Sequence, residues 1–366
     1  MVSWVSVADI HFDNADHWGV QFASGINSRD LDRMALLSQS IDYAIEHKVT
    51  FFVLLGDVFN TSRPVERLKK LVFAEVGRLL ENKIDVYFLM GNHEQGAFDT
   101  AYTTAEVFAD FINEGPVKLH IITEPLLTDH YNDIRFLFTP WMKNPDNFLS
   151  NYDKDYDVLF GHMEIIGAKM GSHEFISKEG VGPAQFKDVH VQLGHYHKPQ
   201  KIGNNIYYIG SLGVCNFGEY DHPHGFSHST AKHDSFSDRV EVKNDFIELH
   251  DRKFIQYEFN TESSELSYRD LITEISEYEK PVVKVILHNT KEVLKSSKLI
   301  EAIKTLRKDL KELASVYAIE ERIKPVENSN LELDQAGDIS IPAIMKQVFT
   351  EPGLLEKATL LLNSVE

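Results

Sequence analysis

The sequence predicts an α/β protein with a mainly parallel inner sheet, and two features support this prediction. Within residues 1–250, short apolar runs alternate with stretches of helical periodicity. Five of the runs end on a short motif that contains a carboxylate, an amide or an imidazole. Strand–helix–strand order favours parallel pairing, and the carboxyl ends of parallel strands meet at one edge of a sheet. We therefore expect the five motifs to form a single site.

The five predicted strands cover residues 2–7, 51–55, 86–90, 158–160 and 189–193. A motif follows each strand, and in order these read Asp9-Ile10-His11, Gly56-Asp57, Gly91-Asn92-His93-Glu94, Gly161-His162 and Gly194-His195-Tyr196-His197. Apolar residues spaced three and four apart predict helices over 29–47, 64–82 and 100–113. Together these elements predict a first domain over residues 1–253.

From residue 254 the pattern changes. Residues 254–259 and 282–287 are predicted strands, and 297–316 is a predicted helix with apolar residues at spacings of three and four. These elements predict a small α+β unit over 254–324. Residues 325–338 are polar and acidic and predict a linker.

The last segment, 339–366, contains two apolar stripes separated by Glu351-Pro352-Gly353. Two short amphipathic helices bury little by themselves, so they either fold back on the preceding domain or bind a partner. The candidate partner-binding residues in these stripes are Ile341, Ile344, Met345, Val348, Phe349, Leu355 and Leu362.

Composition excludes several classes of protein. The chain has 366 residues, of which 43% are hydrophobic and 25% charged, as is typical of a globular protein. No apolar run approaches the ~20 residues that span a bilayer. Cys215 is the single cysteine, which excludes an internal disulfide framework. With an N-terminus that lacks signal-peptide features, this predicts a cytoplasmic protein, or one in the host cytoplasm if a bacteriophage encodes it.

The net charge of −19 argues against a protein that coats nucleic acid by bulk electrostatics. Residues 284–311 are an exception, because basic residues outnumber acidic ones there. This stretch is either the solvated face of a helix or a surface that faces a polyanion. A second local feature is the histidine-rich stretch 222–233, which we interpret as a loop without a metal.

The residue types in the five motifs predict a site for two divalent metal ions. None of the donors is a cysteine, so a structural zinc or iron–sulfur site is not expected. Seven mixed oxygen and nitrogen donors also exceed what one tetrahedral ion uses. Asp57 is the natural bridge, because a carboxylate offers two oxygens. The candidate ligands are Asp9, His11, Asp57, Asn92, His162, His195 and His197.

His93 is the candidate catalytic residue. It directly follows the ligand Asn92, so its ring is expected to point away from that metal. It could then act on the leaving group or on the phosphate in the transition state. Asn60 lies three residues after Asp57, and we expect it to hydrogen-bond His93.

The ordered motifs resemble those of the calcineurin-like metallophosphoesterase superfamily. The finer resemblance is to the nuclease subunit of the SbcCD-type double-strand-break repair complex, including its tailed-bacteriophage versions. It rests on residues 194–225, with their GHxH motif, Gly-Ser turn and Phe-Gly-Glu, and on the Phe-Thr-Pro-Trp strand end at 138–141.

This resemblance implies a four-layer α/β/β/α metallophosphoesterase sandwich with a small α+β DNA-capping domain and C-terminal helices. It implies two ions, typically manganese, and His93 as the catalytic histidine. One ion would lie on Asp9, His11, Asp57 and His197, and the other on Asp57, Asn92, His162 and His195.

The resemblance also implies a 3′→5′ exonuclease on duplex ends and an endonuclease on single strands. It implies an SMC-like ATPase partner that binds the C-terminal segment, and a homodimer formed through helices 64–82 and 100–113. The candidate DNA-binding residues are Lys198, Lys291, Lys295, Lys298, Lys304 and Lys308.

The sequence departs from the family pattern at two positions. Glu94 stands where an aspartate is commoner, which is a mild chemical change. Asn60 stands where many members carry aspartate or histidine. A neutral amide cannot share charge with His93, so the balance of exonuclease and endonuclease activity is left open.

Two other interpretations are also open. A phosphomonoesterase or cyclic-nucleotide phosphodiesterase of the same superfamily would act on a small molecule or a phosphoprotein. Residues 254–366, which a small phosphodiesterase does not need, favour the nuclease. A non-catalytic scaffold with the same fold would usually lose ligands, whereas all seven are present here.

Overall fold

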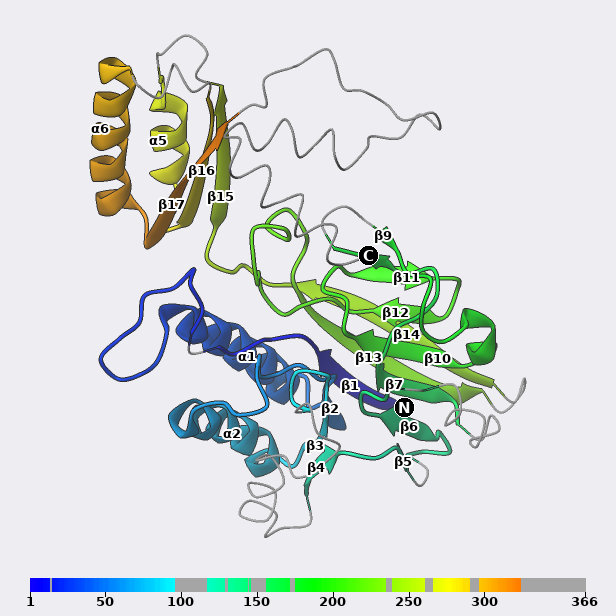
Figure 1. Ribbon diagram of the computed structural model, residues 1–366. Helices are drawn as coiled ribbons and strands as arrows, with labels where there is room; N and C mark the ends of the chain where they lie inside the picture. Colours follow the sequence, from blue (N-terminus) through cyan, green and yellow to red (C-terminus); the bar gives the residue numbers. More distant parts are fainter. Residues whose placement is uncertain are drawn as a thin grey trace, which may run out of the picture.

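The computed structural model describes residues 1–13, 15–95, 117–128, 131–143, 145, 156–171, 175–234, 239–260, 266–289 and 296–323. Two six-stranded sheets are packed together, and a separate three-stranded sheet follows them in the chain (Figure 1). This mixed α/β sandwich confirms the predicted fold class. Outside the described residues lie the predicted helix 100–113, Lys291, Lys295, the linker 325–338, and the segment 339–366 with its candidate partner-binding residues.

The first sheet has the strand order β14-β13-β1-β2-β3-β4. Four of its strands run parallel: β1 (Val2–Val7), β2 (Phe51–Leu54), β3 (Asp85–Leu89) and β4 (Leu119–Ile122). The antiparallel pair β13 (Gly225–Asp234) and β14 (Arg239–Glu248) extends the sheet beyond β1. The predicted loop over 222–233 is therefore wrong from Gly225 onward. On β13, Ser227 and Ser229 are buried where apolar residues would be expected. The sequence of this strand therefore lacks the usual alternation of apolar and polar residues.

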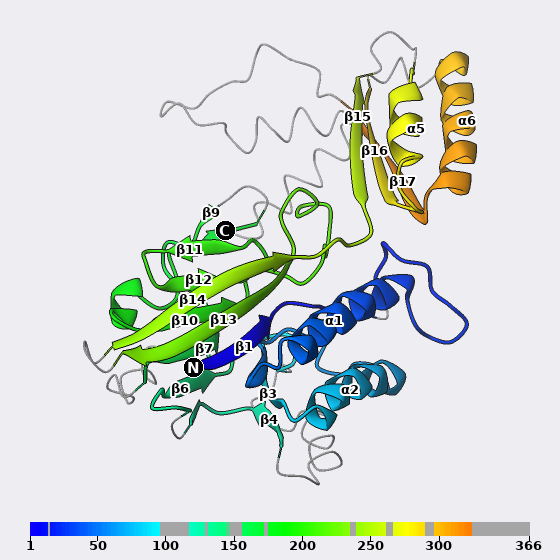
Figure 2. The same cartoon turned by 180° about the vertical axis from the view of Figure 1, so that it is seen from behind.

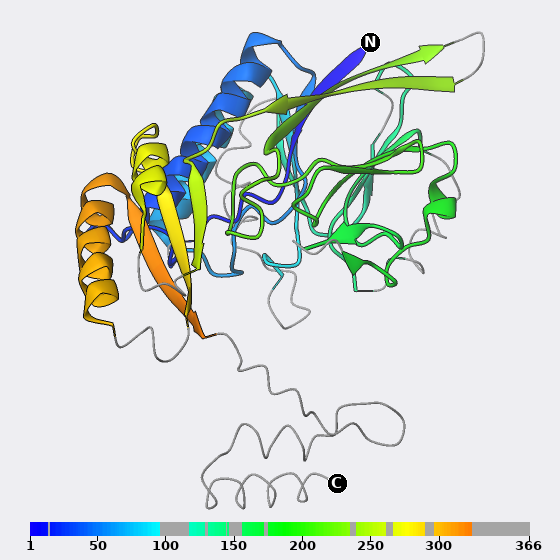
Figure 3. The same cartoon turned by 90° about the horizontal axis from the view of Figure 1, so that it is seen from above.

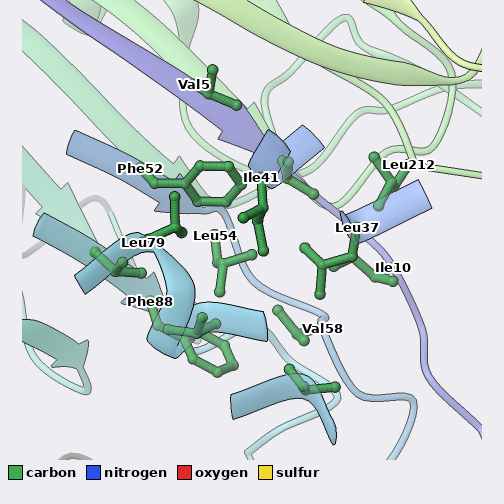
Figure 4. Close-up of a cluster of buried hydrophobic side chains, with 14 of the residues drawn as sticks. Val5, Ile10, Leu37, Ile41, Phe52, Leu54, Val58, Leu79, Phe88 and Leu212 are labelled. Carbon is green, nitrogen blue, oxygen red and sulfur yellow. The ribbon is translucent and has the colours of Figure 1, made fainter. Parts of the chain in front are cut away.

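Helices α1 (Ser28–Glu46) and α2 (Glu66–Glu81) cover the outer face of the first sheet (Figure 2). The Asn27 side chain begins α1 by accepting a hydrogen bond from the Arg29 amide at 2.9 Å. Leu37 and Ile41 of α1 and Leu79 of α2 pack in one apolar core with the sheet (Figure 4). The sheet side chains in that core include Val5, Phe52, Leu54 and Phe88.

The second sheet has the order β11-β12-β10-β7-β6-β5. Its parallel strands are β6 (Phe136–Thr139), β7 (Val158–His162), β10 (His190–Gly194) and β12 (Ile206–Tyr208). The edges β5 (Leu126–Leu127) and β11 (Gln200–Ile202) are antiparallel. On its outer face the described residues include the 3-10 turn η1 (Pro183–Phe186), whose Phe186 is buried, and the hairpin of β8 (Lys169–Met170) and β9 (Phe175–Ile176).

The layer between the two sheets is aromatic, with a polar cluster inside it. Trp4 of the first sheet makes edge contacts with Phe136 and Phe160 of the second, each with ring centroids 5.6 Å apart. The polar cluster centres on Gln192 of β10. Its Oε1 accepts from Trp4 Nε1 at 3.0 Å and from Ser6 Oγ at 2.7 Å. Because these buried polar groups are paired, the hydrogen bonds that tie β10 to β1 offset the cost of removing the groups from water.

The three-stranded sheet has the parallel order β15-β16-β17. It is built from β15 (Phe254–Asn260), α5 (Arg269–Ile275), β16 (Val282–Asn289), α6 (Ser297–Leu313) and β17 (Val316–Ile323). Both helices lie on the face turned away from the two large sheets (Figures 1 and 3). The helix predicted over 297–316 ends at Leu313, because Val316 pairs with Val282 in β17. Helix α5 and strand β17 are additional to the predicted elements.

An apolar contact and a hydrogen bond attach the small unit to the large one. The rings of Phe254 and Phe217 lie 4.9 Å apart, between centroids. Arg252, at the end of the large unit, donates to the backbone oxygen of Lys280 at 2.9 Å and forms an ion pair with Asp32 of α1 at 2.7 Å. Among the described residues, no helix is long and apolar enough to cross a membrane.

Candidate metal centre

The structure brings all seven predicted ligands to one edge of the sandwich, where strands of both sheets end. Asp9 and His11 follow β1, Asp57 follows β2, and Asn92 follows β3. His162 ends β7, while His195 and His197 follow β10. The first sheet thus contributes the three oxygen donors and one imidazole, and the second sheet contributes three imidazoles.

Four of these residues have an uncommon backbone conformation. The φ angles of Asp9, His11 and Asp57 are 50°, 54° and 50°, and that of His195 is 99°. Positive φ is uncommon for residues with a side chain, and strained backbone of this kind tends to cluster at functional sites. The surrounding structure holds this geometry: the His195 amide donates to both carboxylate oxygens of Asp9 at 3.0 Å. Of the ten non-glycine residues with positive φ in the described part of the chain, four are therefore predicted ligands.

Two glycines permit the close approach of these loops. A Cβ on Gly91 would lie 2.1 Å from Asp57 Oδ1, and a Cβ on Gly56 would lie 2.4 Å from His162 Nδ1. Gly56 also has a φ of 91°. Any side chain at either position would displace a candidate ligand.

The donors form two adjoining groups. In the first, the donor atoms of Asp9, His11 and His197 all lie within 4.8 Å of one another. The Nε2 atoms of His11 and His197 are 3.0 Å apart. This grouping places His197 with the residues of the first predicted ion.

In the second group, the donor atoms of Asp57, His162 and His195 lie within 4.8 Å of one another. Asn92 Oδ1 is 3.0 Å from His162 Nε2 and 3.1 Å from His195 Nδ1. Asp57 Oδ2 is 3.3 Å from His162 Nε2 and 3.9 Å from His11 Nε2. Asp57 therefore borders both groups, which is the position required of a bridging carboxylate.

The separations and hydrogen bonds of these donors fit divalent cations. Two neighbouring ligands on an octahedral ion with bonds of about 2.1 Å lie about 3 Å apart, close to the distances between the paired donors here. Each imidazole also has an oxygen acceptor for its outer nitrogen, which leaves the lone pair of the inner nitrogen for a metal. The acceptors are Asn60 Oδ1 for His11 (3.1 Å), Leu55 O for His162 (2.7 Å), Glu164 Oε1 for His195 (3.3 Å) and Glu219 Oε1 for His197 (2.9 Å).

The buried charges are balanced within this group. Burial raises the pKa of Asp9 to about 6. Burial also acts to raise the pKa of Asp57, but the neighbouring His162 outweighs it and the pKa falls below its ordinary value. Burial acts to lower the pKa of His162, and Asp57 reverses this and raises it to about 9. Burial lowers the pKa of His195 to about 3, so its ring is neutral at pH 7 and able to bind a metal.

His93 lies on the solvent side of Asp57, with its side chain 39% exposed. Its amide donates to Asp57 Oδ1 at 2.9 Å, and its Nε2 is 3.9 Å from Asp57 Oδ2. Its Nδ1 donates to the backbone oxygen of Asn60 at 3.1 Å. The His93 ring is therefore fixed beside Asp57, which borders both donor groups. It does not take part in the contacts of Asn92 with His162 and His195.

The expected role of Asn60 needs a correction. Asn60 does hydrogen-bond His93, but through its backbone oxygen, which any residue at this position offers. Its side chain instead accepts from His11 Nδ1 at 3.1 Å and donates to Asp13 at 2.7 Å. The amide therefore acts on the ligand His11, and its neutral charge does not bear directly on His93.

Glu94 has a structural role that the motif did not indicate. Its buried carboxylate accepts hydrogen bonds from the amides of Asp57 (3.0 Å), Phe59 (2.8 Å) and Gly91 (2.8 Å). It therefore ties the loop after β2 to the loop after β3. No sequence signal reveals this role, because the contacts depend on how the two loops meet.

Four other residues adjoin the ligands. Glu219 and Glu164 orient His197 and His195 as described above, and the Trp141 ring lies 4.9 Å from the His195 ring. Glu219 belongs to the Phe-Gly-Glu and Trp141 to the Phe-Thr-Pro-Trp that carried the resemblance, so both could have been proposed from the sequence. Glu164 has no comparable signal. Cys215 also adjoins the first group, with its sulfur near His197 and Glu219.

The predicted DNA-binding lysines that the structure describes are not part of the metal centre. Lys198 is half-buried directly after His197. Lys298, Lys304 and Lys308 are exposed on α6, on the far side of the small sheet (Figure 2). In the histidine-rich stretch, His224 hydrogen-bonds Ser211 and the backbone of Glu219, and His228 hydrogen-bonds Tyr43. These contacts give both histidines roles within the fold.

Two adjoining sets of oxygen and imidazole donors at the ends of strands define a metal-dependent hydrolase with room for a pair of ions. The family model described as calcineurin-like phosphoesterase matches residues 5–199, and the chain belongs to this family. The family uses divalent metals, so the chain is a metal-dependent phosphoesterase. The comparison with curated proteins finds no match.

The solved structures that match the chain include an archaeal phosphodiesterase and a dimetal phosphatase from Danio rerio. The first is 13% identical with a TM-score of 0.33, and the match covers 66% of this chain and 99% of that one. The second is 13% identical with a TM-score of 0.27, and the match covers 54% of this chain and 70% of that one.

Proposed function

We propose that this phosphoesterase is a DNA nuclease that degrades duplex ends 3′→5′ and cuts single strands, as the nuclease subunit of a recombination or repair complex with an SMC-like ATPase. Family membership supports hydrolysis of a phosphoester. The observation that favours DNA is the second unit, residues 254–323, with a basic helix, attached to the domain that carries the metal centre.

The segment from Phe217 to Glu219 contacts both the small unit and the metal centre. Phe217 packs on Phe254 at the start of the small unit, and Lys284 of β16 lies over the Phe217 ring at 5.9 Å. Two residues later, Glu219 accepts the hydrogen bond of His197. A long polymer can contact both units at once, whereas a small phosphate ester needs only the metal centre.

The basic helix α6 has an asymmetric surface. Leu299, Ile303, Leu306 and Leu310 pack against the small sheet, while the exposed positions include Lys298, Lys304, Arg307, Lys308 and Lys311. Such a face suits contacts with phosphates that position a nucleic acid without reading its sequence. Since α6 lies far from the metal centre, we expect it to matter for long substrates and not for short ones.

Bound at the two donor groups, divalent cations, for which we propose manganese, would offset the charge of the transition state and lower the pKa of a water nucleophile. The protein contributes the rest through His93. The Asn60 carbonyl can only accept a hydrogen bond, so His93 Nδ1 carries a proton. The imidazolium form can then donate from Nε2 to the phosphate or to the departing sugar oxygen.

The dimer and the ATPase complex belong to the same proposal. On α2, Leu71 is 36% exposed, as is Val65 just before the helix, so this helix offers apolar surface to a second copy. We propose that residues 339–366 bind the ATPase. Deleting them should abolish that complex and leave the cutting of short substrates; an unchanged complex would disprove the assignment.

The decisive experiment compares substrates. The chain with manganese should degrade end-labelled duplex DNA and cut single-stranded DNA, and an Asp57→Asn variant prepared in parallel should show no activity, which excludes a contaminating nuclease. Hydrolysis of p-nitrophenyl phosphate esters without any cutting of DNA would instead assign a small-molecule or phosphoprotein substrate. No activity on either class would favour a scaffold.

A further inference from the structure

The four histidines of the metal centre differ in what fixes the position of their ring protons. A neutral imidazole carries one proton and binds a metal through the nitrogen that lacks it. Three of the rings turn their outer nitrogen to oxygens that only accept a hydrogen bond, namely Leu55 O for His162, the Glu164 carboxylate for His195 and the Glu219 carboxylate for His197. These rings must therefore carry a proton on the outer nitrogen. His11 is the one of the four whose outer nitrogen faces a side-chain amide, that of Asn60.

An amide does not by itself fix the proton of His11. Its oxygen accepts and its NH₂ group donates, and the two have almost the same size. The Asn60 oxygen lies 3.1 Å from His11 Nδ1, so Nδ1 must carry the proton and Nε2 keeps a free lone pair. With the amide reversed, Nδ1 would be the acceptor and the proton would lie on Nε2. Because Nε2 faces His197 at 3.0 Å and Asp57 at 3.9 Å, this reversal would close the first donor group to a metal.

Asp13 determines which way the amide lies. Its Oδ2 accepts a hydrogen bond from Asn60 Nδ2 at 2.7 Å. A carboxylate has no proton to donate, so the NH₂ group must face Asp13 and the amide oxygen must face His11. A reversed amide would place its oxygen against the carboxylate and would lose a charge-assisted hydrogen bond. The direction of the amide, and with it the proton of His11, therefore depends on Asp13.

The Asp13 carboxylate is itself held in place. Its Oδ1 accepts from the Ala15 amide at 2.9 Å, and the Asp13 amide donates to Asp30 Oδ1 at 2.8 Å. Asp30 lies in the first turn of α1 and is 1% exposed. From the loop after β2, the backbone amide of Asn60 donates to Phe12 O at 3.0 Å. The start of α1 and the loop after β2 thus fix the Asp13 and Asn60 side chains against each other.

We propose that Asp13 is a positioning residue of the metal centre. It acts through Asn60 to keep the proton of His11 on Nδ1, which leaves Nε2 open to the first ion. The carboxylate, the amide and the imidazole form a relay that does for His11 what a single carboxylate does for His195 and His197. The role concerns metal binding, so it is independent of which phosphoester the chain hydrolyses.

The first test uses the full wild-type chain without metal. Nitrogen-15 NMR of labelled histidine rings distinguishes a ring protonated on Nδ1 from one protonated on Nε2, and the His11 signals are those missing in His11→Gln. We expect the His11 proton on Nδ1. A proton on Nε2 would overturn the inference without any variant at position 13.

The second test removes the fixed direction of the amide. In Asp13→Asn the side chain keeps its size but offers a donor as well as an acceptor, so the Asn60 amide can lie either way. We expect both tautomers of His11 in the NMR spectrum. In isothermal titration calorimetry with manganese, one ion should bind about 10- to 100-fold more weakly, the usual loss when the support of a ligating histidine is removed. The other ion should bind as in the wild type.

Two further variants separate positioning from support of the loop. The exchanged pair, Asp13→Asn with Asn60→Asp, places an acceptor-only carboxylate beside His11 and a donor at position 13. It should restore both the Nδ1 proton and the affinity of the weakened ion. The control is Asp16→Asn, because Asp16 lies in the same loop but pairs with Arg33 at 2.7 Å. We expect a single His11 tautomer in this control.

Several outcomes would overturn the inference. One is a single Nδ1 tautomer with two ions at wild-type affinity in Asp13→Asn. Another is an equal loss of both ions, or a loss that the exchanged pair does not restore, because Asp13 would then support only the loop. If Asp13→Asn does not fold, a folded exchanged pair with the His11 proton on Nε2 would refute the relay equally. No nucleic acid enters these measurements, so their failure is distinct from failure of the proposed nuclease function.

Discussion

The two large sheets contribute to the metal centre in different ways. The first supplies both carboxylates, the amide and one imidazole, and the second supplies only imidazoles, two of which have a carboxylate behind them. Charge that neutralises the cations therefore comes directly from the first sheet and indirectly from the second. This difference implies that the first sheet determines whether ions bind at all, and the second determines how tightly and in which orientation.

The largest expected effect is that of Asp57→Asn, because Asp57 adjoins both donor groups. We expect it to weaken both ions together and to reduce phosphoesterase activity by about a thousandfold or more. Isothermal titration calorimetry gives the stoichiometry. The matched variant on the second sheet, His195→Gln, should weaken one ion only. Two ions bound at wild-type affinity in Asp57→Asn would contradict the bridging position.

The next effect concerns His93, which belongs to the first sheet but lies outside the ligand set. His93→Ala should reduce activity by about 10²- to 10⁴-fold, the usual contribution of a positioned acid or base. Metal stoichiometry should stay at the wild-type value, measured by the same calorimetry. Near wild-type activity with both ions present would exclude His93 from the chemistry.

A smaller effect distinguishes the two carboxylates behind the second sheet. Replacing an acceptor of this kind typically costs 10- to 100-fold in metal affinity. Glu219 is closer to its histidine than Glu164, at 2.9 Å against 3.3 Å, and its side chain is less exposed, at 12% against 30%. Glu219→Gln should therefore weaken metal binding more than Glu164→Gln. A larger loss of metal affinity in Glu164→Gln would mean that the distance and burial of the carboxylate do not determine how strongly it supports its histidine.

The smallest effect is on pH dependence. In the metal-free protein Asp57 raises the pKa of His162 to about 9, so His162 is protonated at pH 7 and a metal must displace that proton. Affinity should then rise with pH up to about pH 9, by at most tenfold per unit for one proton. Calorimetry at pH 7 in buffers of different ionisation enthalpy counts the protons released. Release of no proton would show that His162 is neutral before the metal binds.

Much of this site could be predicted from the sequence, since each ligand directly follows an apolar strand and strand ends converge. The strand β1 has the predicted bounds, and the seven candidate ligands lie close together. The pairing of β13 with β1 could not be predicted, because Ser227 and Ser229 replace apolar residues on a buried face. The roles of Glu94 and Glu164 were also hidden, since both act across loops that are distant in the chain.

The buried hydrogen bonds from Trp4 and Ser6 to Gln192 have a mechanical consequence. Face-to-face sheets held by apolar contacts alone resist separation well but resist sliding poorly, because apolar contacts are not directional. Gln192 lies two residues before Gly194, and Ser6 lies three residues before Asp9, so these directional bonds act close to both rows of ligands. A shift of one residue, about 3.3 Å, would break them and would move one row past the other by more than a metal–ligand bond length. The polar cluster thus acts against shear, and it keeps the donors of the two sheets in register before any ion arrives.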